Sequence, residues 1–290
     1  MDSRSLRLAG LAVAAGLTLA GCQSGAHPSP PPTGTTKSVA CTGDVTAALQ
    51  NAVNAGGDPT VSVGPGTCDL SGTIDVANPV TIDGAGSDQT FLVQTVRKVM
   101  LRVTASHVTV ENINLNNRTH NLTLPPMDSE SNPDPNVMGM NGSDETLRNV
   151  TASGGNGFGI RFVAPMGAVC RSRPNSGIVV DNVDITTTGL GGYGALGLDC
   201  LNSATLTNIT ISGGILAFYL DANVTLNGFH FTSVYEQTDG RYGIACQNAV
   251  EITTGNNFNI QNVNGGPVAN RYGATAVSIT NNQVRAGCPS

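Results

Sequence analysis

The sequence predicts an all-β fold in which short parallel strands wind into stacked coils, a parallel β-helix. Three observations lead to this prediction. A strand motif recurs along the chain, a second apolar segment lies between its copies, and helix formers are scarce, with 36 Gly among 290 residues. Alternating apolar and polar residues indicate strands, and self-similarity at a period of roughly 20 to 50 residues indicates a repeat architecture.

The recurring motif places an asparagine between two short alternating arms. It reads VTVENINL at 108–115, ETLRNVTA at 145–152, IVVDNVDI at 178–185, ATLTNITI at 204–211, VTLNGFHF at 224–231 and VSITNNQV at 277–284, with a lengthened copy, VEITTGNNFNI, at 250–260. Equivalent strands of stacked coils pair in parallel about 4.8 Å apart. We therefore expect the side-chain amides of Asn112, Asn149, Asn182 and Asn208 to hydrogen-bond from coil to coil as an asparagine ladder.

A second apolar segment, often preceded by glycine, lies between copies of the motif. The segments are GFGIRFV at 157–163, GALGLDC at 194–200, LAFYLDA at 216–222 and YGIACQN at 242–248. A single coil cannot bury its apolar side, whereas stacked coils share one continuous core. We therefore predict a single β-helix domain over residues 41–290.

The N-terminus has the form of an export signal. Arg4 and Arg7 precede an apolar run from Leu8 to Ala20 that is too short to span a bilayer comfortably. The sequence LAGC that follows resembles a bacterial lipobox, which implies a signal peptide at 1–21, cleavage before Cys22 and lipidation of its thiol. Residues 22–40 are rich in Pro, Ser, Thr and Gly and are predicted to be a flexible tether. We expect an exported protein held by lipid on the outer face of the bacterial cell membrane.

The segment after the tether resembles the entry of pectin-lyase-like right-handed parallel β-helix proteins. A helix is predicted over residues 45–55, followed by VSVGPGT at 61–67 and VTIDGAG at 80–86. The resemblance implies a right-handed β-helix over residues 41–288, with the short N-terminal helix capping the open end of the core. It leaves the activity open, because this fold carries lyases, hydrolases, epimerases and non-enzymatic surface proteins.

Six cysteines follow Cys22, and an even number in an exported chain predicts up to three disulfides. Their order along the chain suggests the pairs 41–68, 170–200 and 246–288, although six cysteines allow 15 pairings. The residues concerned are Cys41, Cys68, Cys170, Cys200, Cys246 and Cys288. None of them has the CxxC spacing that is typical of zinc sites.

The charge of the chain bears on its partners. The net charge is −6, with a pI near 5.0 and no basic cluster, which argues against a nucleic-acid partner. We instead expect a polysaccharide or cell-envelope glycan, together with the membrane through the lipid anchor.

The candidate catalytic residues lie in two Leu-Asp pairs, Leu198-Asp199 and Leu220-Asp221. Alternation directs both aspartates outward, and a coil that runs from the first pair to the second would place them side by side. Arg161 would stand over Gly197 and balance their charge. In glycoside hydrolysis, one carboxylate of such a pair acts as the general acid and the other as the general base or the nucleophile. Alternatives are a Ca²⁺ site, and two turn residues that bind only their own backbone.

Aromatic and charged residues nearby are expected to contact substrate. Tyr219 would stack on a sugar, and a loop containing Glu236, Arg241 and Tyr242 would wall the same groove. The predicted function is therefore binding or cleavage of polysaccharide, as a lyase or glycoside hydrolase. The chain lacks the N-T-D, D-D, G-H-G and R-I-K motifs of β-helix hydrolases, and RSRPNSG at 171–177 only approaches the R-x-P-x-x-R pattern of pectate lyases. A non-catalytic adhesion or envelope-scaffold protein is the alternative.

Overall fold

The computed structural model describes fourteen stretches of the chain. They are residues 34–96, 98–118, 137–154, 159–163, 175–186, 196–199, 201, 203–212, 216–219, 223–233, 250–252, 257–264, 268–270 and 276–280. Side chains are described as far as residue 211, those of Val163 and Asp199 excepted. The predicted signal peptide at residues 1–21 and Cys22 lie outside these stretches.

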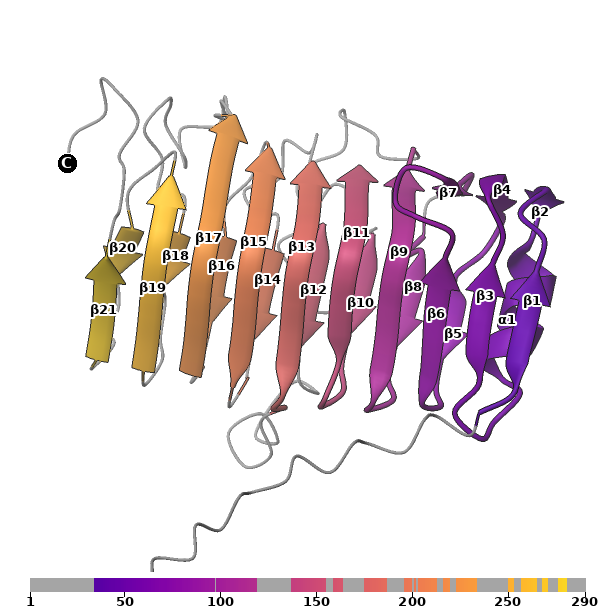
Figure 1. The fold of residues 1–290 in the computed structure, drawn as a ribbon, viewed down its shortest axis with the longest axis horizontal. Coiled ribbons are helices and arrows are strands. Elements are labelled where there is room, and N and C mark those ends of the chain that lie inside the picture. Colours follow the sequence, from indigo (N-terminus) through magenta and orange to yellow (C-terminus); the bar gives the residue numbers. More distant parts are fainter. Residues whose placement is uncertain are drawn as a thin grey trace, which may run out of the picture. The chain divides into compact units, whose positions relative to one another are not determined.

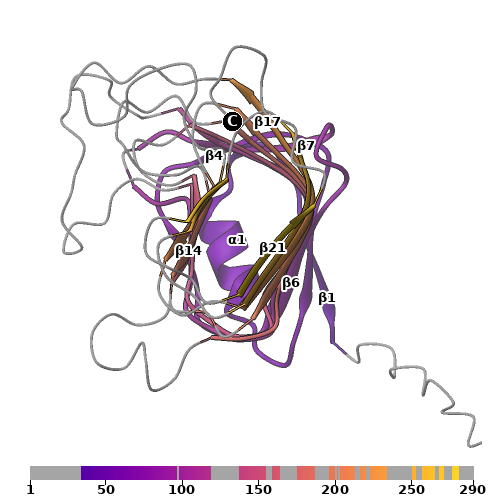
Figure 2. The same ribbon diagram turned by 90° about the vertical axis from the view of Figure 1, so that its left-hand side faces the viewer.

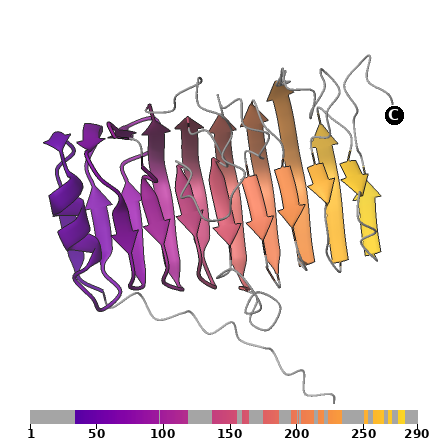
Figure 3. The ribbon, with the colours of Figure 1, turned by 180° about the vertical axis from the view of Figure 1, so that it is seen from behind.

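The strands of residues 34–290 form two parallel sheets (Figure 1; Figure 3 shows the reverse side). Sheet A contains β1 (Thr36–Val39), β2 (Gly43–Asp44), β3 (Thr60–Val63), β4 (Gly66–Leu70), β6 (Val80–Gly84), β7 (Thr90–Gln94), β9 (Val108–Asn117), β11 (Thr146–Gly154), β13 (Ile178–Thr186), β15 (Ala204–Ser212), β17 (Asn223–Ser233), β19 (Asn257–Asn264) and β21 (Ala276–Thr280). Sheet B contains β5 (Ile74–Val76), β8 (Leu101–Val103), β10 (Met138–Met140), β12 (Ile160–Val163), β14 (Leu196–Asp199), β16 (Leu216–Tyr219), β18 (Val250–Ile252) and β20 (Val268–Asn270).

Both sheets follow the chain in order. From β8 to β19 the chain alternates between a short strand of sheet B and a long strand of sheet A, and each strand pairs in parallel with its equivalent one coil later. The predicted all-β class and the parallel stacking are confirmed, and the arrangement is compatible with a parallel β-helix.

Each long strand of sheet A from β9 to β19 consists of two arms joined at a corner. In β9, Thr109–Glu111 pairs with β11 as the first arm and Ile113–Asn117 as the second, while Asn112 is skipped. Before β9 the two arms are separate strands, because β6 pairs with the first arm and β7 with the second. The corner asparagines have φ between 51° and 56°, a left-handed conformation that asparagine adopts more readily than most residues.

Three of the four predicted asparagines, Asn112, Asn149 and Asn182, form the ladder. Asn112 Nδ2 donates to Asp83 Oδ1 at 2.8 Å, Asn149 Nδ2 to Asn112 Oδ1 at 2.9 Å, and Asn182 Nδ2 to Asn149 Oδ1 at 2.8 Å. Asn208 has the same left-handed φ of 53° one coil later. The recurring asparagine is therefore explained by structure: it turns the chain and bonds one coil to the next.

The core consists of the inward residues of both sheets. Along β9 buried positions alternate with partly exposed ones on each side of the corner, as in Val108, Val110, Ile113 and Leu115. Sheet B contributes apolar pairs such as Ile160 and Phe162, both fully buried. In the part of the chain described, no helix is long and apolar enough to cross a membrane.

One helix occurs in the described stretches, α1 (Thr46–Val53), within the range where a helix is predicted. It contacts β1, β3 and β5 at the N-terminal end of residues 34–290 (Figure 2). Leu49 and Val53 are fully buried. The Gln50 amide accepts from Asp75 N and donates to Asp75 O, both at 2.8 Å. It thus satisfies the backbone of β5, which has a strand neighbour, β8, on one side only.

The start of α1 is fixed by a polar cluster. Asp44 accepts hydrogen bonds from Ser71 Oγ and Thr46 Oγ1, both at 2.6 Å, and from Thr46 N at 3.0 Å. The Ser71 bond and then the Thr46 bonds lower the pKa of Asp44 to about 2. The carboxylate therefore remains ionised and accepts a hydrogen bond from the backbone N–H of Thr46, the first residue of the helix.

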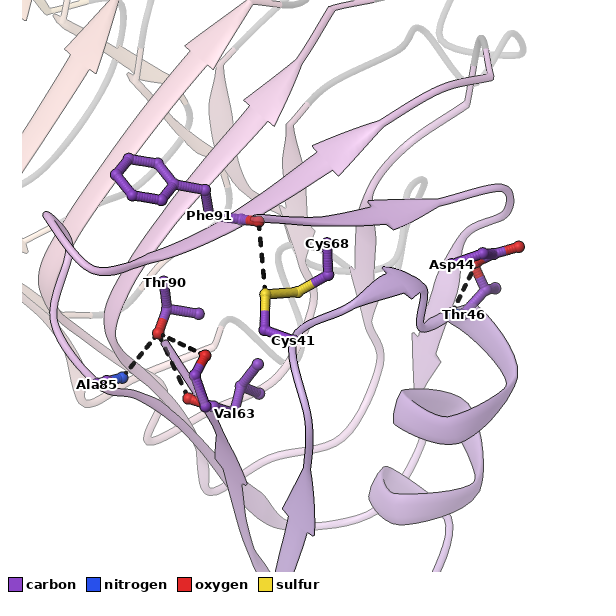
Figure 4. The surroundings of a disulfide bond; sticks show 9 residues. Cys41, Asp44, Thr46, Val63, Cys68, Ala85, Thr90 and Phe91 are labelled. Atoms are coloured by element: carbon purple, nitrogen blue, oxygen red, sulfur yellow. Dashed lines mark hydrogen bonds between the residues drawn. A yellow bond between two sulfur atoms is a disulfide. The ribbon is translucent and has the colours of Figure 1, made fainter. Parts of the chain in front are cut away.

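Cys41 and Cys68 form a disulfide, with their Cα atoms 4.9 Å apart (Figure 4). Both are buried, and Cys41 Sγ lies 3.9 Å from the Phe91 carbonyl oxygen. The first of the three suggested pairs is therefore confirmed. Cys170, Cys200, Cys246 and Cys288 lie outside the described residues.

Two boundaries differ from the sequence expectation. β1 falls within the range 22–40 predicted as tether, because Thr36–Val39 pairs with β3. The predicted single strand at 250–260 is wrong, since β18 belongs to sheet B and β19 to sheet A. The segment 242–248, expected as the next short strand, lies outside the described residues; β18 is the strand that pairs with β16.

Candidate functional site

The outer face of sheet B is narrow, because its strands are three or four residues long. One register position runs along all eight strands through Asp75, Arg102, Gly139, Arg161, Gly197, Ala217, Glu251 and Ala269. In β8 and β10 this middle residue is at least partly exposed between two buried neighbours. We call this row the sheet-B column.

Arg161 stands in the sheet-B column between two glycines. Gly139 pairs with it on one side and Gly197 on the other. Among the described residues, a Cβ at Gly139 would meet no atom within 4 Å, so this part of the structure leaves space beside Arg161 and Arg102. Arg161 itself is half-buried. A guanidinium flanked by glycines can contact the oxygen atoms of a bound molecule, because the guanidinium presents several hydrogen-bond donors in a fixed plane.

The other arginine of the column has a carboxylate beside it. Arg102 Nε donates to Asp75 Oδ1 at 2.5 Å, and both side chains are about half exposed. Exposed ion pairs of this kind contribute little to stability. Arg102 therefore provides a comparison for Arg161, because it has the same register position but lies between Asp75 and Gly139 rather than between two glycines.

The predicted pairing of the two Leu-Asp sequences is wrong in register. Asp199 lies opposite Tyr219, not opposite Asp221, and Gly197 lies opposite Ala217. The coil from β14 to β16 is therefore two residues shorter than predicted, because Asp199 pairs with Tyr219 rather than with Asp221. A shift of this size keeps every side chain on the same face, so alternation alone does not distinguish the two registers.

A signal for the correct register was present elsewhere in the sequence. Ala204 pairs with Val224 in sheet A, and these are the first residues of two neighbouring copies of the asparagine motif, ATLTNITI and VTLNGFHF. The step from Ala204 to Val224 equals the step from Asp199 to Tyr219. Since both sheets belong to the same coils, the motif spacing also sets the register of β14 against β16. The motif repeat was the stronger guide, and the Leu-Asp repeat was misleading.

The structure brings three predicted site residues onto neighbouring strands of sheet B. Arg161 is on β12, Asp199 ends β14, and Tyr219 ends β16. Arg161 and Asp199 lie two register positions apart, because Val163 is the residue opposite Asp199. Asp221, Glu236, Arg241 and Tyr242 lie outside the described residues. Among those described, no group of three or more His, Cys, Asp or Glu side chains is placed to hold a metal, and the expected Ca²⁺ stays a prediction.

A row of threonines on sheet A was missed by the site analysis. One register position on the first arm runs through Thr36, Thr60, Thr81, Thr109, Thr146, Val179, Thr205, Thr225, Asn259 and Ser278. We call this row the threonine column. It was visible in the sequence as the second residue of each motif copy, for example in VTV, ETL, ATL and VTL.

The row next to the threonine column contains charges. Arg148 Nη1 lies 3.3 Å from Glu111 Oε2, and Arg148 Nε lies 4.0 Å from Asp181 Oδ2. The threonine column itself contains no charged residue, and from Thr36 to Thr205 its described side chains are threonines interrupted only by Val179. Its spacing is set by the strands, about 4.8 Å from coil to coil.

Comparison with known proteins does not assign the chain. No protein-family model matches it, and no curated protein matches its sequence.

Proposed function

We propose that this chain is a right-handed parallel β-helix of the pectin-lyase-like type, with α1 as the cap of its core. The parallel sheets, the left-handed asparagine corners and the contacts of α1 with β1, β3 and β5 support this. Its N-terminal sequence supports export and lipidation at Cys22, which would hold the domain on the outer face of the bacterial cell membrane.

Within this proposal the sheet-B column binds or cleaves polysaccharide. The observation that carries it is Arg161 beside the open floor at Gly139, with Asp199 and Tyr219 ending the next two strands. Arg161 would bind substrate oxygens, and Tyr219 would contact a sugar face. Asp199 and Asp221 would supply acid and base or nucleophile, or hold Ca²⁺ for β-elimination. Residues Glu236, Arg241 and Tyr242 would complete the binding surface.

Replacing Arg161 with glutamine is expected to weaken glycan binding or turnover by about tenfold or more, because a hydrogen bond to a charged group contributes about 1.5–3 kcal/mol. The measurement is release of reducing ends or unsaturated products, together with binding, on a panel of neutral and acidic polysaccharides. Arg102→Gln is the matched control and should retain function, because Arg102 lies two register steps from Arg161, on the side away from Asp199 and Tyr219.

The catalytic assignment has its own test on the same panel. The double variant Asp199→Asn, Asp221→Asn should bind glycan but release no product. Full turnover by this variant would remove the aspartates from the mechanism. Equal losses of glycan binding or turnover in the Arg161 and Arg102 variants would instead show that these arginines affect function only by stabilising the fold.

The threonine column favours a second candidate function, non-catalytic attachment to the cell envelope. Seven threonines and one serine occupy its ten positions, which gives a repeating surface without acids or bases. A surface of this kind suits adhesion to an ordered polymer rather than chemistry on it.

In this case the double variant Thr109→Val, Thr146→Val should be retained severalfold less on insoluble cell-envelope preparations, since each change removes a hydroxyl but keeps a β-branched side chain. Val179→Thr is the complementary variant and should be retained at least as well as the parent. Unchanged retention in both variants, with loss in Arg161→Gln, would place binding on sheet B.

A further inference from the structure

Glu145 occupies a position in the core that is otherwise apolar. Thr146 pairs with Thr109 and Val179, so the residue before it lies opposite Val108 and Ile178. Val108 and Ile178 are buried and continue the row to Val80 and Ala204, which are also buried. Glu145 is 0 % exposed. A carboxyl group therefore points into the core where adjacent coils have Val and Ile.

The two oxygens of Glu145 have different surroundings. Oε1 accepts a hydrogen bond from Gly142 N at 2.8 Å, whereas Oε2 is buried without a partner in the structure. Burial raises the pKa of Glu145 to about 8, against the opposing effect of the Gly142 and Asn141 backbone N–H groups. Among the described residues, no charged side chain contributes to this shift. Two titratable side chains lie near Glu145: Asp144, the preceding residue, and His107, in the equivalent turn of the coil before. Both are exposed.

The turn that Glu145 closes is held tightly between the coils. Ser143 N donates to Ser106 Oγ in the coil before, and Asp144 N donates to Ser176 O in the coil after. A Cβ at Gly142 would come within 2.1 Å of Ala105 O, so the backbone approaches that coil closely. On the core side, the turn is held by the hydrogen bond from Gly142 N to Glu145 Oε1. Movement of the carboxyl out of the core would therefore break this bond and loosen residues 141–145.

We propose that Glu145 is a proton-operated latch on the turn 141–145. When the carboxyl holds its proton it stays in the core and bonds Gly142 N. When the proton is lost to solvent, the carboxylate moves toward water, and the turn between β10 and β11 opens. In the described part of the chain, two further buried polar atoms without partners, Asn141 Oδ1 and Asn175 Nδ2, lie in this turn and in the segment stacked on it, where water would enter. The latch does not depend on the proposed glycan function.

The direction of the pH effect follows from the raised pKa. Between the ordinary value of 4.5 and about 8, the closed form holds a proton that the open form releases. Opening therefore becomes easier as pH rises through this window, by up to about tenfold per pH unit, and changes no further above it. Below the ordinary pKa both forms hold the proton, and the latch is fully closed.

Hydrogen exchange of the backbone amides of residues 142–146 tests the latch. The native chain is compared at each pH, from about 5 to about 9, with Glu145→Gln at the same pH, so that intrinsic exchange rates cancel. The excess opening of the native chain should grow with pH and level off near the raised pKa. Asp144→Asn, which removes the exposed acid next to it, should behave like the native chain.

Equal protection of the native chain and Glu145→Gln at every pH would overturn the proposal, as would loss of the pH dependence in Asp144→Asn. If Glu145→Gln does not fold, Glu145→Val restores the apolar residue of the row. The urea unfolding constant of the native chain should then rise relative to Glu145→Val across the same window. A constant ratio between the two would equally contradict the latch.

Discussion

Replacing Asn149 with alanine is expected to destabilise the protein by about 2–5 kcal/mol. Asn149 is the middle rung of the ladder: its Nδ2 donates to Asn112 Oδ1, and its Oδ1 accepts from Asn182 Nδ2. Each lost hydrogen bond costs about 0.5–1.5 kcal/mol, and the partner groups are left without their bonds. Alanine at φ 51° adds about 1–2 kcal/mol of backbone strain. Urea unfolding monitored by circular dichroism measures the loss.

Two further variants separate the contributions at Asn149. Asn149→Gly should avoid the backbone strain, because glycine adopts positive φ readily. The glycine variant should therefore be more stable than the alanine variant by at least about 1 kcal/mol. Asn114→Ala, on the same outer side of β9 but away from the corner, should change stability by no more than about 0.5 kcal/mol. If Asn149→Ala were as stable as Asn114→Ala, the ladder would contribute nothing to the fold.

The second large effect is expected at the N-terminal disulfide. The double variant Cys41→Ala, Cys68→Ala should lose about 3 kcal/mol, because the bridge closes a loop with a sequence separation of 27 and restricts the unfolded chain. Both cysteines are changed together so that no free thiol remains at this bridge. The thermal midpoint and the urea midpoint should fall in parallel.

Reduction of the native chain is the complementary measurement for this bridge. It should cost at least as much stability as the double variant does. Any further loss when the double variant is itself reduced would report bridges among Cys170, Cys200, Cys246 and Cys288. A double variant as stable as the native chain would show that the packing around α1 holds this end without the bridge.

Much of the fold can be predicted from the sequence because the asparagine motif recurs with the same alternation in each copy. Alternating apolar residues mark the strands, and the asparagine between two arms marks a corner that asparagine adopts at low cost. Residues 45–55 contain α1, and the order of the cysteines suggested the 41–68 pair that the structure contains. These features are local, or depend on a period that can be counted along the chain.

The candidate site was less predictable, because it depends on how strands align across coils. The sequence placed Arg161 opposite Gly197, and the structure has this pair. It did not place Asp199 against Tyr219, since this register and the one that would align Asp199 with Asp221 direct the same side chains outward. The open space at Gly139 also depends on packing, which no local pattern encodes.

The sequence by itself predicted parallel coils around an apolar core with an asparagine ladder, and it suggested the bridge between Cys41 and Cys68. Beyond the asparagine ladder and the pairing of Arg161 with Gly197, only the tertiary structure decided which residues share a row, and hence that Glu145 lies in the core while Asp199 lies opposite Tyr219. The physical reason is that alternation fixes the face of a residue, whereas its neighbours are fixed by stacking, which depends on the length of every loop between.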